Sequence, residues 1–214
     1  MLSVIINNMA IAIEATKTDI PGLTFLPRMT QLGNDDDWPF ITCSSEVSTQ
    51  NFELMDRVCK PFMTHGVVEI GVSRNGIASF TQALLQNKPD DVKYLGIDIN
   101  DKTYLDDKEK NIYTIKESSS NRQAVMEYMK EIGMEKISLL FIDGWHSLNQ
   151  VINDWMFTEL LSEDGIVVFH DTNYHPGPAV FIEAIDHTQY RVEKHFSNQD
   201  DYGMAIAYKK KTEL

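Results

Sequence analysis

Short apolar runs alternate with segments of helical periodicity from residue 66 onward. The apolar runs predict strands at residues 67–72, 92–99, 112–115, 137–142 and 165–169, and a closing hairpin at 190–196 and 204–208. The periodic segments predict helices at residues 75–86, 122–132, 151–161 and 181–185. Because the central strands lack polar alternation, both of their faces are expected to be covered. The pattern therefore predicts an α/β fold with a doubly wound, mostly parallel seven-stranded sheet and a C-terminal antiparallel hairpin.

Residues 1–64 are less regular, and their prolines and Gly33-Asn34 predict no long element before residue 45. The apolar start, 1–13, predicts a strand or a helix, and a short helix is expected around Phe52 and Met55. We divide the chain into an N-terminal extension, residues 1–64, which serves as a lid and substrate region, and a main domain, residues 65–214.

Composition and charge narrow the class of protein. The chain has 214 residues, of which 43% are hydrophobic, as in a globular domain. Its formal charge of −13 argues against nucleic acid and against an anionic membrane surface as partners. Two cysteines and the lack of a secretion signal favour a cytoplasmic protein. The oligomeric state stays open, with a homodimer as one option.

The stretch Val67–Gly76 predicts a strand, a tight turn and the start of a helix. It contains Gly-x-x-x-x-Gly, formed by Gly71 and Gly76. Gly71 would let the chain turn sharply, and Gly76 would let the helix approach the sheet. Such a turn leaves room for a nucleotide-like ligand beside exposed backbone N–H groups. The alternative is a glycine turn without a ligand.

Polar residues follow each predicted parallel strand, where doubly wound sheets bind ligands. They are Ser73, Asp98, Glu117, Ser118, Asp143, His146, His170 and Asp171. Asp98 lies near the interval expected of a ribose-binding carboxylate, although it could simply begin a surface turn. A dinucleotide would favour glycine where Ser73 stands, and Glu69 is acidic. An adenosine cofactor without phosphates, S-adenosyl-L-methionine, fits better, with Glu69 near its sulfonium or amino-acid end.

Four motifs together resemble those of class I S-adenosylmethionine-dependent methyltransferases, in particular small bacterial O-methyltransferases. The motifs are Glu69-x-Gly71-x-x-x-x-Gly76, Leu95-Gly96-Ile97-Asp98, Phe141-Ile142-Asp143-Gly144-Trp145-His146 and Gly165-Ile166-Val167-Val168-Phe169-His170-Asp171. The resemblance covers roughly residues 65–210. It implies a Rossmann-like fold, S-adenosyl-L-methionine as cofactor, and methylation of an oxygen on a small molecule or sugar.

The catechol O-methyltransferase branch of this superfamily also implies a metal site. By position, Asp143 matches its first metal ligand, and His170 and Asp171 match its second pair. Trp145 matches an aromatic residue that packs on adenine, and His146 stands where that branch has its base. His170 departs from the pattern, since Mg²⁺ prefers oxygen ligands. Magnesium, manganese, iron, zinc and no metal therefore all stay open.

Each of these residues also has a purely structural interpretation. His146, expected to titrate near neutrality and remove the acceptor's proton, could instead only bind Asp143. His170 could orient Asp171, and Trp145 could simply pack. The turn at residues 175–178 and the Trp38-Pro39-Phe40 region are candidate covers for the acceptor. Competing functions are a nicotinamide-dependent oxidoreductase and an inactive binding module.

Overall fold

The computed structural model describes residues 2–6, 9–29, 49–73, 80–195 and 202–211. Its strands are β1 (Leu2–Ile6), β2 (Met9–Thr16), β3 (Leu26–Met29), β4 (Gly66–Ile70), β5 (Lys93–Asp98), β6 (Ile112–Lys116), β7 (Ile137–Ile142), β8 (Leu161–His170), β9 (Tyr190–His195) and β10 (Met204–Lys209). Its α-helices are α1 (Thr49–Leu54), α2 (Phe80–Asn87), α3 (Arg122–Glu131), α4 (Leu148–Trp155) and α5 (Pro176–Ile182). None of these described helices is long and apolar enough to cross a bilayer.

The larger sheet has seven strands in the order β6-β5-β4-β7-β8-β10-β9. The pairs from β6 to β8 are parallel, while β10 pairs antiparallel with both β8 and β9. The sequence order reverses beside β4, so the carboxyl ends of β4 and β7 flank the switch point of the sheet, where such folds bind ligands. The predicted fold class is confirmed.

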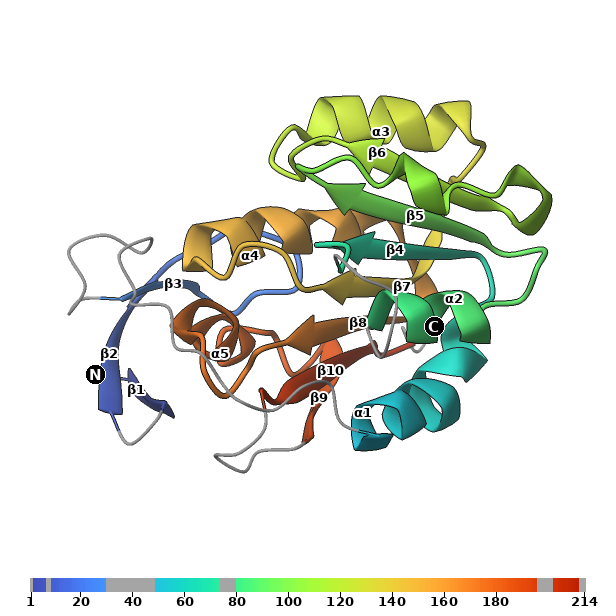
Figure 1. The fold of residues 1–214 in the computed structure, drawn as a ribbon. Helices are drawn as coiled ribbons and strands as arrows, with labels where there is room; N and C mark the ends of the chain where they lie inside the picture. Colours follow the sequence, from blue (N-terminus) through green and yellow to red (C-terminus); the bar gives the residue numbers. More distant parts are fainter. Residues whose placement is uncertain (1, 7–8, 30–48, 74–79, 196–201, 212–214) are drawn as a thin grey trace.

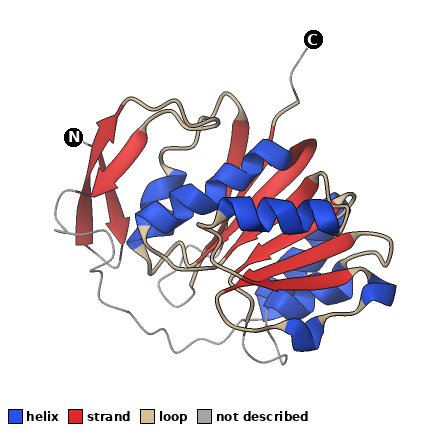
Figure 2. Cartoon of the chain, turned by 90° about the horizontal axis from the view of Figure 1, so that it is seen from above, coloured by secondary structure: helices blue, strands red, loops and turns tan. Residues whose placement is uncertain are grey.

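Helices cover both faces of this sheet, and each face has its own apolar core. Figure 2 shows the red strands between two layers of blue helices. Val68 and Leu140 pack in one core with residues of α3, α4 and α5. Their neighbours Val67 and Leu139 pack in the other with residues of α1 and α2. Alternate residues of one strand are thus buried on opposite faces, which explains the unbroken apolar runs.

Several element boundaries differ from the predictions. Helix α4 begins at Leu148 because the Ser147 hydroxyl accepts a hydrogen bond from the N–H of Gln150, 3.2 Å away. Helix α5 begins at Pro176, so the turn predicted at residues 175–178 is instead the first turn of a helix. Helix α2 is described from Phe80, and the first part of its predicted range lies outside the described residues.

The N-terminal segment forms a separate antiparallel sheet, in the order β1-β2-β3. Strand β2 has eight residues, so the expectation of no long element before residue 45 is wrong. Figure 1 shows this sheet beside α5. Leu23 bridges to Ile185, and the indole N–H of Trp155 donates to the carbonyl of Pro21 at 2.8 Å. Ile11 and Ile13 join the core of the larger sheet, which fixes the segment to that domain.

Ser138 ties the start of β4 to β7. Its buried hydroxyl accepts from the N–H groups of Thr64, His65 and Gly66 at 3.0, 3.1 and 3.4 Å. Ser138→Ala should lower the free energy of unfolding by about 1–3 kcal/mol, because these donors lose their acceptor. Urea unfolding measures the change, with the exposed Ser3→Ala as control. Equal midpoints for the two variants would contradict this role.

Candidate active site

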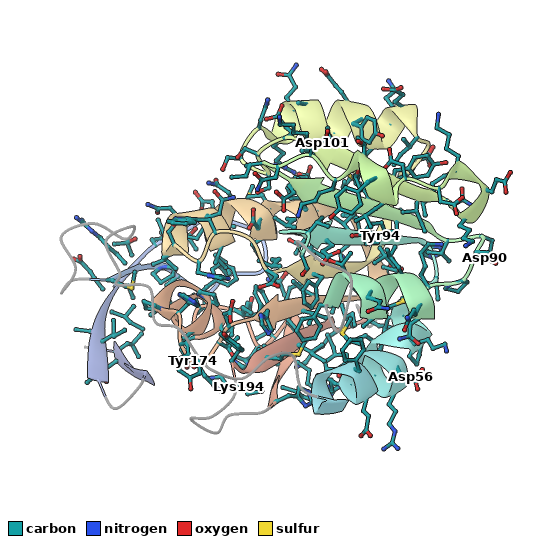
Figure 3. The ribbon with its side chains drawn as sticks, viewed as in Figure 1. Asp56, Asp90, Tyr94, Asp101, Tyr174 and Lys194 are labelled. Atoms are coloured by element: carbon teal, nitrogen blue, oxygen red, sulfur yellow. The ribbon has the colours of Figure 1, made fainter. Side chains whose placement is uncertain are left out.

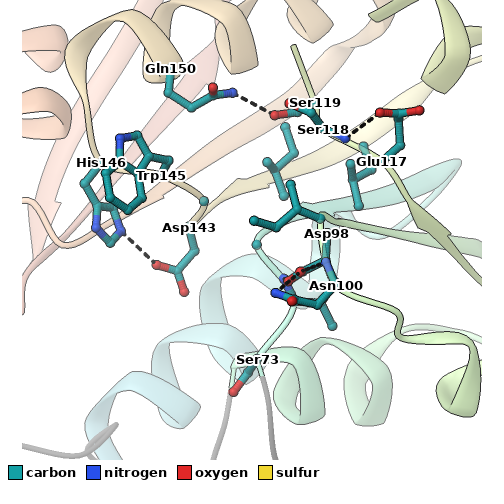
Figure 4. A pocket seen from close by; sticks show the side chains of 16 residues that line it. Ser73, Asp98, Asn100, Glu117, Ser118, Ser119, Asp143, Trp145, His146 and Gln150 are labelled. Atoms are coloured by element: carbon teal, nitrogen blue, oxygen red, sulfur yellow. Dashed lines mark hydrogen bonds and ion pairs between the residues drawn. The ribbon is translucent and has the colours of Figure 1, made fainter. Parts of the chain in front are cut away.

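A cavity of about 510 Å³ opens at the carboxyl ends of β4, β5, β6 and β7 (Figure 4). Its lining combines a glycine turn, carboxylates, hydroxyls and aromatic rings. The lining residues are Ile70, Gly71, Val72, Ser73, Ile97, Asp98, Ile99, Asn100, Glu117, Ser118, Ser119, Asp143, Gly144, Trp145, His146 and Gln150. The structure thus brings together Gly71, Ser73, Asp98, Glu117, Ser118, Asp143, Trp145 and His146 from the sequence-based candidates.

Close backbone contact between the ends of β4 and β7 forms the floor of the cavity. The N–H of Asp143 donates to the carbonyl of Ile70 at 2.9 Å. Gly71 has φ +88°, and a Cβ there would lie 2.1 Å from the carbonyl oxygen of Asp143. Only glycine permits both this backbone conformation and this approach. Gly76, the second glycine of the motif, lies outside the described residues.

The N–H groups of the described part of the turn are already hydrogen bonded. Gly71 donates to the carbonyl of Ile97 at 2.9 Å, and Val72 to Asp98 Oδ2 at 3.0 Å. Ser73 donates to the Thr81 hydroxyl at 3.0 Å. The expectation of exposed backbone N–H groups is therefore wrong for residues 71–73, which leave side chains as the polar groups of this part of the cavity.

Glu69 lies behind the turn and does not line the cavity. Its carboxyl group is 1% exposed and accepts hydrogen bonds from the hydroxyls of Thr81, at 2.7 Å, and Tyr94. Figure 3 labels Tyr94 in the interior of the molecule. Burial raises the pKa of Glu69 to about 8. Glu69 thus reaches the cavity only through Thr81, whose hydroxyl accepts from Ser73.

Asp98 offers its carboxylate at the rim of the cavity. Oδ1 accepts from the N–H of Asn100 at 2.7 Å and from its side-chain amide at 3.1 Å. Oδ2 holds the turn through Val72. The bond from the exposed Asn100 side chain is the one that a ligand hydroxyl could replace without disturbing the backbone.

The cavity lining away from the glycine turn contains both apolar and polar side chains. Trp145 and Ile99 line it, and they are 67% and 70% exposed. Ser119 and Gln150 also line it, and both donate to Asp154 Oδ1, at 2.7 and 2.8 Å. Sequence reasoning missed these polar residues, because nothing in the spacing of Ser119 and Gln150 indicates that they meet at a buried aspartate.

Two aspartates and two histidines form an ion cluster beside the cavity. His146 Nε2 lies 2.7 Å from Asp171 Oδ2 and 3.6 Å from Asp143 Oδ1. His170 Nδ1 lies 3.1 Å from Asp143 Oδ1 and 3.4 Å from Asp171 Oδ2. His170 and Asp171 do not line the cavity but reach it through Asp143 and His146.

The cluster holds its histidines in the charged form. Burial by itself would lower the pKa of His146, but the carboxylates of Asp143, 3.6 Å from its Nε2, and Asp171, 2.7 Å away, outweigh burial and raise the pKa to about 9. The pKa of His170 is likewise well above its ordinary value, because the charges of both aspartates outweigh burial. The expectation that His146 titrates near neutrality is therefore wrong for this arrangement of charges.

The backbone at Asp171 is strained, and neighbouring elements stabilise it. Asp171 has φ +60°, which is uncommon outside glycine and is found at functional sites. Its carbonyl accepts from the N–H of His175 at 3.1 Å. The His175 ring stacks on that of His146, with centroids 4.1 Å apart. A Cβ at Gly177 would lie 2.1 Å from the carbonyl of His146, so glycine allows α5 to bring His175 here.

The donor atoms of the cluster suit a divalent cation. Asp143, His170 and Asp171 offer ligand atoms that all lie within 4.8 Å of one another, and so do His146, Asp171 and His175. Within the described part of the chain, His170 Nε2 and Asp171 Oδ1 are buried without a hydrogen-bond partner. Buried polar atoms are normally paired, so these two atoms are available to a ligand.

Strand order and cavity position define a Rossmann-like fold of the class I methyltransferase type. Residues 68–172 match the family model Methyltransf_24, described as "Methyltransferase domain". This match, over just under half of the chain, confirms the resemblance to class I S-adenosylmethionine-dependent methyltransferases. No curated protein matches the chain.

Solved structures share this fold. MycE, from the mycinamycin biosynthetic pathway and in complex with Mg, SAH and mycinamycin VI, has 15% identity and a TM-score of 0.54, over 74% of this chain. The match spans 49% of MycE, about half its length. The O-methyltransferase from Bacillus cereus in complex with SAH has 12% identity and a TM-score of 0.55, over 78% of this chain and 84% of its own. At such identities the similarity shows the fold alone.

The buried carboxyl group of Glu69 predicts a pH dependence of stability. In the folded state its pKa is about 8, against an ordinary value of 4.5. Between these values the unfolded chain loses the proton and the folded chain keeps it, so stability falls as pH rises from 5 to 8. In Glu69→Gln the free energy of unfolding should fall less over this window. Urea unfolding at several pH values measures it, with the exposed Glu163→Gln as control. Parallel curves for Glu69→Gln and wild type would refute the burial of a protonated carboxyl group.

Proposed function

We propose that this chain is an S-adenosylmethionine-dependent methyltransferase that acts on an oxygen of a small molecule or sugar. One observation carries the proposal: the cavity offers side-chain oxygens and exposed apolar side chains, while the N–H groups of residues 71–73 are already paired. This surface suits a nucleoside without phosphates.

The paired turn disfavours the nicotinamide-dependent alternative. A dinucleotide fold binds its pyrophosphate through free backbone N–H groups and needs glycine for close approach. Here Ser73 carries a side chain, and its N–H is committed to Thr81. A pyrophosphate at residues 71–73 would have to break these hydrogen bonds.

The residues of the cavity can be divided among the parts of the cofactor. We propose that Asp98 binds the ribose hydroxyls, since a carboxylate accepts two charge-assisted hydrogen bonds. Trp145 would pack on the adenine, and Glu117 and Ser118 would also border the cofactor. Gly71 allows the close approach of the chain at the end of β4, Ser73 would border the cofactor, and Gly76 keeps its proposed place in the same turn. Glu69 would act indirectly, by holding Thr81.

His146 and Asp143 are the proposed catalytic residues. S-adenosyl-L-methionine supplies an electrophilic methyl group when bound, and the acceptor hydroxyl must lose a proton. His146 would take that proton, and the carboxylate of Asp143, 3.6 Å from its Nε2, would stabilise the imidazolium that forms. With its pKa at about 9, His146 can act as a base only when another positive charge satisfies Asp143 and Asp171.

A divalent cation is the charge that fits the cluster best. We propose that Asp143, His170 and Asp171 would hold it, since their ligand atoms lie within 4.8 Å of one another and Asp171 Oδ1 has no hydrogen-bond partner among the described residues. An imidazole among the ligands favours Mn²⁺ over Mg²⁺. Such an ion would supply Lewis acidity toward the acceptor hydroxyl.

The acceptor side of the site is proposed to involve residues 1–64. The β1-β2-β3 sheet lies beside α5 (Figure 1), whose first residues follow His175. The chain around Trp38, named above as a candidate cover, lies outside the described residues. A small-molecule acceptor, a cytoplasmic location and the option of a homodimer belong to the same proposal.

Removing the proposed ribose ligand should weaken cofactor binding. For Asp98→Ala we expect the affinity for S-adenosylhomocysteine to fall by about 1–3 kcal/mol, because hydrogen bonds to a charged group are lost. Titration calorimetry measures the affinity, with Asp101→Ala as a control, since Asp101 is exposed and binds only Thr103. Unchanged affinity in Asp98→Ala would rule out the ribose role.

A wild type that binds NADH and not S-adenosylhomocysteine would overturn the proposed function.

The metal proposal can be tested by binding alone. Asp171→Asn removes a carboxylate, and asparagine tolerates the positive φ of this position, so the fold should persist. We expect wild type to bind Mn²⁺ in calorimetry and Asp171→Asn to bind it at least about tenfold more weakly. Asp186→Asn, whose carboxylate caps a surface turn at Thr188, should bind like wild type. A wild type that takes up no Mn²⁺, or equal binding by all three, would contradict the metal site.

A further inference from the structure

A buried ammonium group lies behind the cavity at Lys102. The Lys102 side chain is 3% exposed and does not line the cavity. Burying a charged amine is costly unless hydrogen bonds and opposite charge compensate it. Its partners therefore indicate why a lysine is present at this position.

The partners of this ammonium among the described residues all line the cavity. Lys102 Nζ donates to the carbonyl of Val72 at 2.6 Å and to that of Ser73 at 3.4 Å. It also lies 3.6 Å from Asp98 Oδ2, the oxygen that accepts from the N–H of Val72. One cation thus connects the turn after β4 to the carboxylate after β5.

We propose that Lys102 is a positioning residue for the cofactor ribose, which fixes the Asp98 carboxylate and the turn at Val72–Ser73 in one arrangement. Lys102 and Val72 hold Oδ2 on the protein side, so that Oδ1 turns toward the rim, where Asn100 is its exposed partner. The inference rests on the proposed function, because it assumes that Asp98 binds a ribose.

Lys88 provides a matched control within the same chain. Its Nζ also donates to two backbone carbonyls, Pro89 at 3.0 Å and Lys110 at 2.6 Å, and the residue is 6% exposed. Neither it nor its partners line the cavity. Lys88→Met and Lys102→Met therefore remove similar buried ammonium groups, one away from the cavity and one behind it.

The test measures the affinity for S-adenosylhomocysteine and for its 2′-deoxy analogue in wild type and both variants. Wild type should prefer the ribose form by about tenfold or more, since the analogue lacks one hydroxyl that binds a carboxylate. Lys102→Met should weaken S-adenosylhomocysteine binding by about ten- to a hundredfold and lose most of the preference. Lys88→Met should keep the wild-type affinity for S-adenosylhomocysteine and the preference for the ribose form. Lys102→Gln, which keeps a donor but no charge, replaces Lys102→Met if the latter does not fold.

The outcomes separate the inference from the proposed function. If wild type does not bind S-adenosylhomocysteine, both the inference about Lys102 and the proposed function are contradicted. If wild type binds it and Lys102→Met keeps the full preference for the ribose form, Lys102 does not position Asp98. If Lys102→Met lowers the affinity for both ligands by the same factor, the inference is also overturned. Such a result would show that Lys102 supports the turn without orienting the carboxylate toward the 2′-hydroxyl.

Discussion

The site depends on the contact between the ends of β4 and β7. The carbonyl of Asp143 occupies the space that a side chain at residue 71 would need, and the N–H of Asp143 is held by Ile70. This contact sets the distance between the turn after β4, which lines the cavity, and the carboxylate of Asp143, which belongs to the ion cluster. Binding and chemistry are thereby placed next to each other by backbone geometry, before any ligand contributes.

The hydrogen bonds of the turn decide what kind of ligand the cavity suits. Asp98, Thr81 and Lys102 are bound to the backbone of residues 72 and 73, which leaves this part of the rim with carboxylate and hydroxyl groups. Such groups bind hydroxyls and cations better than they bind phosphates. The same choice appears at the ion cluster, where two carboxylates are balanced by histidines. The groups that line the turn therefore suit a nucleoside better than they suit a pyrophosphate.

The sequence was sufficient for what depends on strand order. Asp98, Asp143 and Trp145 could be placed at one edge because each follows an apolar run, and parallel strands end at the same edge. The sequence alone was insufficient wherever the residues that contact a side chain belong to distant elements. The burial of Glu69 depends on Tyr94 and Thr81, and the raised pKa of His146 depends on Asp171, which lies on another strand end. The sequence predicts a turn at residues 175–178, yet proline also begins helices. The close packing of Gly177 on His146 is visible only in three dimensions.

A crystal structure of the chain with S-adenosylhomocysteine bound tests the central claim most directly. The ribose hydroxyls should lie within hydrogen-bond distance of Asp98, the adenine should lie against Trp145, and the hydrogen bonds of Val72 and Ser73 should stay as they are. A nucleoside bound away from this edge of the sheet, or a turn whose N–H groups leave Asp98 and Thr81 to bind the ligand, would contradict it.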